Sequence, residues 1–301
     1  MKILLTGCHG QIGWELVRSL LPLGELICIT RAQADFTKLH ELRELIQKHR
    51  PKVIVNAAAY TAVDKAEQES GRAFLINAEA PLILAEEAKK IGALFIHYST
   101  DYVFDGTKAS PYDEDDTPHP LNVYGQSKLA GEQAIQALST DYLILRTSWV
   151  YAARGRNFLK TILRLAAERE ELSIVADQIG APTWARLIAD TTAHVLRQSM
   201  LDRQLCRFHS SIYHLTTVGS TSWHGFSSRI IDLARQYGNT DLKSRILTPI
   251  LTTDYPLPAK RPANSRLSVD RLEKRFGLYM PTWEGALELC MQELMGDNPK
   301  S

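Results

Sequence analysis

The sequence is poor in cysteine and has no long hydrophobic run. Its four cysteines, Cys8, Cys28, Cys206 and Cys290, lack the paired spacing of a disulfide framework or a zinc site, and this pattern indicates a reducing compartment. No apolar run approaches the roughly 18 residues that a membrane-spanning helix needs. A strand begins directly after Met1, without the basic and apolar segments of a secretion signal. We therefore expect a cytoplasmic protein that does not bind membranes.

The sequence also lacks an excess of charge of either sign. It has 35 basic and 34 acidic residues, a formal net charge of +1. Such a balance gives no general attraction to nucleic acid or to an anionic membrane surface, so any binding of anions must be local. No internal repeat or low-complexity tract is present. With 301 residues, 45% of them hydrophobic, the chain is long enough for one large domain or two smaller ones.

Short apolar runs alternate with helical segments through the first half of the chain. This alternation predicts a Rossmann-type α/β fold, a doubly wound parallel sheet with right-handed crossovers, over residues 1–151. The pattern becomes less regular from about residue 152. We expect residues 152–301 to form mainly a smaller, interspersed C-terminal substrate-binding lobe, with a segment at about 212–237 returning to the main domain. The expected strands are 2–5, 26–29, 53–55, 94–98 and 142–145, and the expected helices include 13–24, 40–49 and 72–91.

A glycine triplet follows the first expected strand. Gly7, Gly10 and Gly13 are spaced three apart, and a helix opens at once. In this context a glycine-rich turn lets backbone amides approach a pyrophosphate, which then lies at the helix N-terminus. The triplet therefore predicts a dinucleotide-binding site.

The second expected strand ends at Thr30 and Arg31, with no acidic residue. An acid at this position would bind the ribose 2′-hydroxyl of NAD, whereas Arg31 can accept the 2′-phosphate of NADP. The alternative is an ordinary exposed loop arginine. In the next loop, Asp35 can reach an adenine ring and Phe36 can cover it. We expect NADPH, with NADH as the alternative.

The stretch from residue 94 to 131 carries the expected chemistry. A buried strand delivers Thr100 and Asp101 at its C-terminal end, the edge at which parallel sheets bind ligands. Tyr124 and Lys128 follow, four residues apart on one helical face. A phenol can give a proton to a carbonyl oxygen that receives a hydride, and a nearby ammonium lowers the phenol pKa. Thr100 can hold the same oxygen. A lone Tyr-x-x-x-Lys pair is more often a solvated helix face, so the upstream strand end and the glycine turn carry much of this interpretation.

Two further features leave alternatives open. Lys260, Arg261 and Arg266 lie in or next to a proline-rich segment at 250–264, which suits a phosphorylated substrate or is a surface loop with incidental charge. Asn77 interrupts an apolar helical face, and it either shapes the site through water or is a satisfied structural residue.

Longer motifs occur in order along nearly the whole chain. They are VNAAAYTAVDKAE at 55–67, HYSTDYVFDG at 97–106, NVYGQSKLAGE at 122–132, RTSWVY at 146–151, DQIGAPT at 177–183 and RPANSRL at 261–267. With the GxxGxxG turn, these motifs resemble the dTDP-4-dehydrorhamnose reductases, a family of the extended short-chain dehydrogenase/reductase superfamily. The resemblance implies reduction of a dTDP-sugar by NADPH or NADH, with the product supplying bacterial surface polysaccharide.

The resemblance also implies roles for individual residues. Tyr124 would donate a proton to the C4 oxygen, Lys128 would lower the pKa of Tyr124 and hold the nicotinamide ribose, and Thr100 would position the reacting oxygen. Asp101 and Trp149 would contact the sugar. Together with Gly7, Gly13 and Arg31 from the patterns above, the cofactor-binding set is Gly10, Gln11, Ile12, Asp35, Phe36, Ala59, Tyr60, Thr61, Tyr98, Tyr124 and Lys128.

Some members of the family use a divalent ion such as Mg²⁺ at a dimer interface. Glu15 is compatible with this role, but Arg186 stands where a second acidic ligand would be wanted. We therefore expect no tightly bound metal, and a homodimer is left open.

Other activities of the superfamily remain as alternatives. Sugar dehydratases follow the site threonine with Asp-Glu, whereas Asp101 is followed here by Tyr102. Epimerases share the Tyr-x-x-x-Lys pair and regenerate a tightly held NAD. Regulatory subunits that bind a dinucleotide without turnover tend to lose the catalytic Tyr or Lys, and both are present here. The sequence therefore favours a reductase.

We predict that Arg31→Ala raises the Michaelis constant for NADPH more than that for NADH, because only NADPH carries a 2′-phosphate for the guanidinium to bind. Steady-state kinetics with each cofactor measure this effect. An equal change for both cofactors would contradict a role for Arg31 in selectivity.

Overall fold

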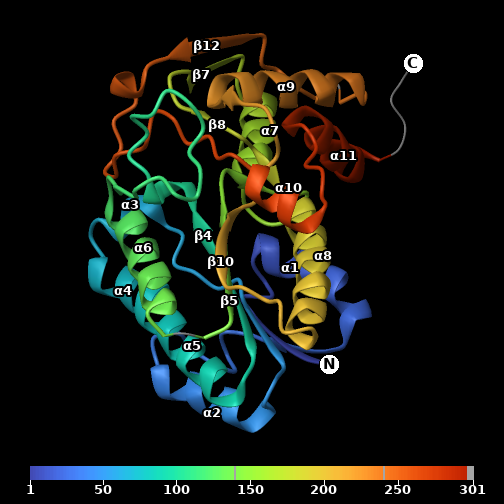
Figure 1. Cartoon of the computed structure of the whole chain (residues 1–301). Coiled ribbons are helices and arrows are strands. Elements are labelled where there is room, and N and C mark those ends of the chain that lie inside the picture. The colour runs from blue at the N-terminus through green and yellow to red at the C-terminus, as the bar shows by residue number, and fades with distance from the viewer. Residues whose placement is uncertain (139, 240, 297–301) are drawn as a thin grey trace.

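A computed structural model of the chain describes residues 1–138, 140–239 and 241–296. Within them, a parallel sheet of six strands runs through the lower half of the molecule in the order β10-β5-β4-β3-β1-β2 (Figure 1). This arrangement confirms the predicted Rossmann-type fold class. The strands are β1 (Lys2–Thr6), β2 (Glu25–Ile29), β3 (Val53–Asn56), β4 (Leu94–Thr100), β5 (Tyr142–Thr147) and β10 (Ser211–His214).

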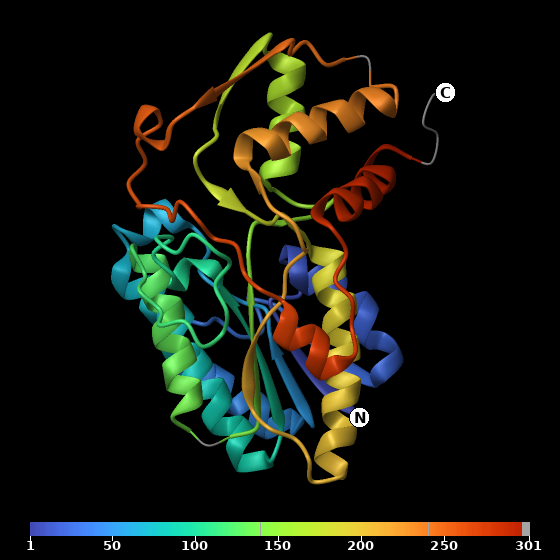
Figure 2. The same ribbon diagram turned by 45° about the horizontal axis from the view of Figure 1, so that its top comes forward.

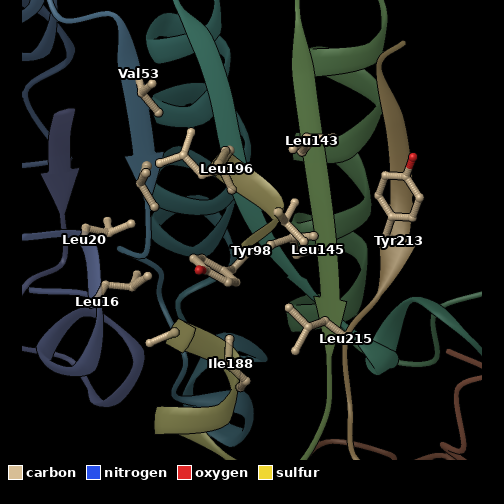
Figure 3. Close-up of a cluster of buried hydrophobic side chains, with 14 of the residues drawn as sticks. Leu16, Leu20, Val53, Tyr98, Leu143, Leu145, Ile188, Leu196, Tyr213 and Leu215 are labelled. Atoms are coloured by element: carbon tan, nitrogen blue, oxygen red, sulfur yellow. The ribbon is translucent and has the colours of Figure 1, made fainter. Parts of the chain in front are cut away.

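Helices cover both faces of this sheet because its strands are apolar on both sides. On one face Ile3 and Leu5 of β1 belong to a core cluster with Leu16 and Ile188, which come from helices α1 (Gln11–Leu20) and α8 (Ala185–Gln204). Figure 3 shows part of this cluster. On the other face Leu4 packs in a second cluster, formed with α2 (Leu39–His49), α5 (Ala80–Ile91) and α6 (Val123–Gln136).

The register of the parallel strands brings their C-terminal ends to one edge. Thr6 of β1 pairs with Asn56 of β3, and Thr100 of β4 pairs with Thr147 of β5. The segments that follow these residues are the glycine turn, the small residues after β3, the Asp101 turn and the loop through Trp149. The fold therefore gathers the expected functional segments before any side chain is considered.

A second group of elements lies beyond that edge, in the upper part of Figures 1 and 2. Its core is formed by α7 (Phe158–Glu168), α9 (Trp223–Gln236) and α11 (Trp283–Met295). Strand β7 (Glu171–Val175) pairs with β12 (Ile246–Ile250). Two short ladders join β8 (Ile179–Gly180) to β11 (Thr221–Ser222) and β6 (Val150–Tyr151) to β9 (Thr183–Trp184).

The second half of the chain contributes to both groups. Within the segment predicted to return at 212–237, β10 joins the sheet beside β5, whereas α9 packs against α7 and α11. Helix α8 precedes this segment and packs against α1. The division of the chain at residue 151 stays a prediction, and residues 297–301 of the expected lobe lie outside the described part.

Several boundaries differ from the sequence-based expectations. The helix expected at 13–24 ends at Leu20 and continues as a 3₁₀ turn that contains Pro22. The helix expected at 72–91 is divided into α4 (Ser70–Phe74), a π-helical turn (Leu75–Glu79) and α5, which has Pro81 in its first turn. The remaining elements are α3 (Val63–Ala66), α10 (Asp270–Phe276) and 3₁₀ turns at Asp101–Val103 and Thr252–Asp254. None of the described helices combines the length and apolarity needed to cross a membrane.

We predict that Leu145→Ala lowers the free energy of unfolding by about 2–5 kcal/mol, because Leu145 is fully buried on β5, which lies between β4 and β10, and its loss leaves a cavity. Urea denaturation measures the change. The matched control Leu289→Ala removes the same atoms from a side chain that is 55% exposed, and we expect a much smaller effect. Equal losses in the two variants would contradict this description of the core.

Candidate functional site

Two adjoining hollows form a continuous groove along the C-terminal edge of the sheet. Arg31 and Phe36 line one end, and Thr100, Lys128 and Trp149 line the other. The glycine turn and the residues after β3 line both hollows. All predicted site residues except Gly13 lie on the wall of this groove. They are Gly7, Gly10, Gln11, Ile12, Arg31, Asp35, Phe36, Ala59, Tyr60, Thr61, Tyr98, Thr100, Asp101, Tyr124, Lys128 and Trp149.

The glycine turn leaves the start of α1 open to the groove. Gly7 has φ +74, and a Cβ there would lie 2.5 Å from the backbone nitrogen of Ala58. Gly10 precedes α1 and provides no side-chain cap, so the first amides of the helix have no side-chain acceptor there. Gly13 lies behind the turn, where a Cβ would meet the carbonyl oxygen of Gly7 at 2.0 Å. The turn can therefore receive a phosphate, and Gly13 supports it by allowing close packing.

At one end of the groove, after β2, Arg31 is exposed and its Nε lies 3.8 Å from Asp35 Oδ2. Hydrogen bonds from the backbone and hydroxyl of Thr37 lower the pKa of Asp35.

The hydrogen bonds of the buried Asn77 are satisfied within the protein. Its side chain accepts from the Tyr60 amide and donates to the Tyr60 carbonyl and to Ser127. It therefore holds the backbone of Tyr60 in place at the groove wall.

Thr100, Asp101 and Tyr124 converge in the second hollow. The Thr100 hydroxyl donates to Asp101 Oδ1 at 2.9 Å. Burial raises the pKa of Asp101 to about 7, against the lowering effect of the hydrogen bond from Thr100. No described residue bonds the other oxygen of Asp101, Oδ2. Burial also raises the pKa of Tyr124 to about 12, against a smaller lowering by a hydrogen bond with Thr100.

Lys128 is almost completely buried and does not bond Tyr124 among the described contacts. Its Nζ donates to the carbonyl oxygen of Tyr98 at 2.6 Å and lies 3.1 Å from Nε2 of His97. Burial lowers the pKa of Lys128 to about 8. The predicted effect of Lys128 on the Tyr124 phenol is not among the causes of the Tyr124 pKa shift, and it stays a prediction. The Tyr98 side chain belongs to the first core cluster, and its hydroxyl bonds Thr192 there.

Trp149 lies at the groove in the loop between β5 and β6. Its φ of +46 is rare for a bulky residue, and its ring stacks on Trp223 with centroids 3.5 Å apart and an interplanar angle of 6°. Trp223 donates from Nε1 to Gln178. Sequence reasoning missed Trp223, which lies 74 positions from Trp149 in the sequence and carries no motif of its own.

The basic residues near position 260 are not among the residues that line this groove. Arg261 pairs with Asp64 at 2.8 Å, and Arg266 donates to the carbonyl oxygen of Ala109, so both guanidinium groups tie segments of the protein together. Phosphate binding by this loop stays a prediction.

Sequence reasoning missed a second basic segment, which does line the groove and contains Arg154 and Arg156. The guanidinium of Arg154 lies 4.6 Å from the ring centre of Trp14 on α1.

Glu15 and Arg186, which stand at the expected metal position, form ion pairs instead of an open ligand set. Arg186 donates to Glu15 at 3.0 Å and to Glu293 at 2.7 Å. Among the described residues, no group of three or more His, Cys, Asp or Glu side chains is arranged to hold a metal ion. The guanidinium therefore occupies the position between the two carboxylates.

Sequence comparison shows what this chain is similar to. The family model for the RmlD substrate binding domain matches residues 1–295. A curated protein from Burkholderia thailandensis named dTDP-4-dehydrorhamnose reductase is 52% identical, over 98% of this chain and 99% of its own length. The protein of the same name from Escherichia coli K12 is 47% identical, over 98% of each chain.

Solved structures agree with the sequence comparison. A dTDP-4-dehydrorhamnose reductase from Bacillus anthracis, in complex with NADP, matches with a TM-score of 0.86 and 36% identity over 97% of this chain and 99% of its own. A UDP-glucose 4-epimerase from Thermus thermophilus, in complex with NAD, matches with a TM-score of 0.78 over 99% of this chain and all of its own. That likeness, at 18% identity, shows the shared fold alone.

We predict that Gly180→Ala weakens the exciton couplet of the Trp149–Trp223 pair in far-ultraviolet circular dichroism, because the new Cβ would lie 2.5 Å from the Trp149 ring and displace it. The matched control Gly71→Ala adds the same methyl group where no atom lies within 4 Å. A couplet that survives in Gly180→Ala would contradict the described contact.

Proposed function

The chain belongs to the family of dTDP-4-dehydrorhamnose reductases, which are NAD(P)H-dependent oxidoreductases, and on that premise we propose that it reduces the C4 keto group of dTDP-4-dehydro-L-rhamnose to give dTDP-L-rhamnose. The observation that carries this proposal is the meeting of Thr100, Tyr124 and Lys128 in one groove with the glycine turn. A related protein from Bacillus subtilis, 37% identical over 97% of each chain, is named as a spore coat polysaccharide biosynthesis protein. We propose the corresponding role, supply of an activated sugar for a surface polysaccharide.

The groove fits a nicotinamide dinucleotide. At Gly7 a side chain would fill the space beside Ala58, and the open start of α1 offers amides to a pyrophosphate. Such a dinucleotide supplies the hydride when bound. Arg31 lies at the far end of the groove, where the adenosine would extend, and no acidic residue ends β2. We therefore propose NADPH as the preferred cofactor, with NADH as the alternative.

Tyr124 is the proposed proton donor. With a pKa of about 12 its phenol is protonated at neutral pH, which is the state that a reduction requires. As negative charge develops on the C4 oxygen, the proton moves from Tyr124 Oη to that oxygen. The Thr100 hydroxyl, at the end of β4, donates to Asp101 Oδ1 in the structure, and in the complex it would turn this proton to the same oxygen and so fix its distance from the phenol.

Asp101 and Trp149 are the proposed sugar contacts. The pKa of Asp101 is about 7, so near neutral pH its carboxyl group exists in both protonation states. Its Oδ2, which no described residue bonds, can then accept a hydrogen bond from a sugar hydroxyl or donate one to it. Trp149 presents an indole at the same hollow, and aromatic rings commonly contact the apolar parts of sugars.

The direct test is the loss of absorbance at the reduced nicotinamide band with dTDP-4-dehydro-L-rhamnose. NADPH and NADH are compared in parallel, with and without a chelator. Oxidation that depends on the sugar supports the reductase and reports cofactor preference and any need for a divalent ion. Folded protein that binds a dinucleotide but oxidises neither cofactor would overturn the proposal in favour of an epimerase or a regulatory subunit.

We predict that Tyr124→Phe lowers turnover by a factor of about 100 or more and leaves cofactor binding largely intact, because it removes only the proton donor. Turnover is measured at saturating substrate, and cofactor binding by fluorescence titration of the same preparation. Near-normal turnover would remove Tyr124 from the mechanism.

A further inference from the structure

A basic segment lines the second hollow together with the glycine turn. It contains Arg154 and Arg156, which follow β6, and Lys160 in the first turn of α7. All three residues are exposed, and none of them forms an ion pair with a carboxylate of the described residues. Arg164, further along α7, is instead paired with Glu168 at 2.8 Å. The three cationic groups of the basic segment are therefore open to an anion from solution.

The second hollow as a whole carries an excess of positive charge. Among the described residues that line it, the lysines and arginines are Lys128, Arg154, Arg156 and Lys160, and the only carboxylate is that of Asp101. The whole chain, by contrast, has a formal net charge of +1. A cleft lined mainly by charges of one sign raises the local concentration of ligands of the opposite sign. The charge distribution therefore favours an anionic ligand in this hollow.

The backbone of the basic segment is held in a tight turn. Asn157 Nδ2 donates to the carbonyl oxygens of Ala152 at 2.7 Å and Arg154 at 3.1 Å. Asn157 Oδ1 accepts from the Lys160 amide at 3.1 Å and so caps α7. Gly155, with φ +72, makes the turn possible between the two arginines. The path of the segment is thus fixed within the protein, and its side chains are the groups left to bind a ligand.

This turn lies against the start of α1. The guanidinium of Arg154 lies 4.6 Å from the ring centre of Trp14, and a Cβ at Gly155 would lie 4.0 Å from Cγ of Gln11. Gln11 in turn donates from Nε2 to the carbonyl oxygen of Val150 at 3.4 Å. The unpaired cations are therefore next to the first turn of α1, whose amides have no side-chain cap.

Gln11 also provides an acceptor without a partner. Because its Nε2 is bonded to Val150, its Oε1 is the free atom, and this oxygen is buried with no bond from any described residue. A phosphate oxygen is also an acceptor and cannot satisfy it, whereas a ribose hydroxyl can donate to it. These groups together suit a phosphorylated nucleoside better than an isolated phosphate ion.

We propose that Arg154, Arg156 and Lys160 bind the diphosphate of a nucleotide ligand between the basic segment and the start of α1. The inference rests on the proposed reductase function, whose two ligands, a nicotinamide dinucleotide and a dTDP-sugar, each carry one diphosphate. Because the reacting ends of both ligands must meet at Tyr124, both ligands enter this groove. The contact with α1 favours the dinucleotide as the source, and binding measurements distinguish the two.

The residue types match this ligand. An arginine can present two parallel N–H donors to phosphate oxygens, and a lysine adds a compact charge. The contact of Arg154 with the Trp14 ring restricts this side chain before any ligand binds. Less conformational entropy is then lost when the guanidinium binds phosphate.

The first test measures binding without turnover. Isothermal titration calorimetry compares the wild-type protein with the double variant Arg154→Gln/Arg156→Gln, with NADP⁺ and dTDP as separate ligands. We expect the affinity for at least one of them to fall by about tenfold or more, because charge-assisted hydrogen bonds to phosphate are lost. A fall for NADP⁺ assigns the segment to the dinucleotide, and a fall for dTDP assigns it to the sugar nucleotide. Unchanged affinity for both ligands would overturn the proposal.

A matched variant controls for the loss of charge. Arg164→Gln/Arg169→Gln removes two exposed arginines from the same helix and its C-terminal end, and neither residue lines the groove. We expect this variant to bind both ligands as the wild-type protein does. A loss of affinity as large as that of Arg154→Gln/Arg156→Gln would overturn the proposal, because any pair of surface cations would then serve equally well.

A matched ligand controls for the rest of the groove. Adenosine 2′-phosphate lacks the diphosphate and keeps the group expected to lie near Arg31. We expect Arg154→Gln/Arg156→Gln and the wild-type protein to bind it equally. An equal loss of affinity for this ligand and for the affected diphosphate ligand would overturn the proposal, because the variant would then disturb the whole groove.

The second test is the dependence of binding on ionic strength. Salt screens attraction between exposed charges. We therefore expect the Kd of the affected ligand to rise more steeply with salt concentration for the wild-type protein than for Arg154→Gln/Arg156→Gln. A purely structural role of the two arginines would leave the salt dependence unchanged. Parallel dependences in the two proteins would overturn the proposal.

These measurements do not depend on turnover. A protein that fails to reduce the dTDP-sugar but loses affinity in the double variant, as expected, would refute the proposed function and leave the diphosphate site in place. An active reductase whose double variant binds NADP⁺ and dTDP as tightly as the wild-type protein would do the reverse.

Discussion

The parallel register of β1, β3, β4 and β5 is the constraint on which the rest of the site depends. It fixes Thr6, Asn56, Thr100 and Thr147 at one edge of the sheet, so four separate segments open into one groove. Because these strands are buried on both faces, their register cannot slip without exposing a core face. The positions of the proposed catalytic groups are thus determined by hydrophobic packing at a distance from the groove.

The same burial explains the unusual protonation states. Lys128 and Arg146 extend into the interior, and a buried charge is unfavourable unless it is paired. The protein stabilises these two buried cationic side chains by different partners. Arg146 cannot lose its proton, and it is bound by the carboxylate of Glu132 through both Nε and Nη2. Lys128 can lose its proton, and it faces a carbonyl and an imidazole. The titratable cation is the one that lies in the groove.

Much of the site could be predicted from the sequence because its main motifs are short and contiguous. The glycine turn and the Thr100–Asp101 strand end are each encoded within a few residues of an apolar strand, so their places at the sheet edge follow from the fold class. Tyr124 and Lys128 lie four residues apart at the start of the helix between two such strands, and their spacing alone puts them on one face. Contacts between distant segments could not be predicted. Trp223, Arg154 and the pairing of Arg261 with Asp64 depend on how the second half of the chain crosses the first. The direct bonds of Asn77 to Tyr60 likewise needed coordinates, because the sequence fits a structural residue and a water-mediated one equally well.

Trp149 shows how the second group of elements takes part in the site. A bulky residue at φ +46 carries strain of about 1–3 kcal/mol. Stacking on Trp223 contributes about 0.5–1.5 kcal/mol beyond the area buried, which is of the same order. Trp223 in turn is fixed by Gln178 and packed against Phe158 of α7. The indole at the groove is therefore held in a strained conformation by residues of the second group of elements, and the orientation of this proposed sugar contact depends on how the second core packs.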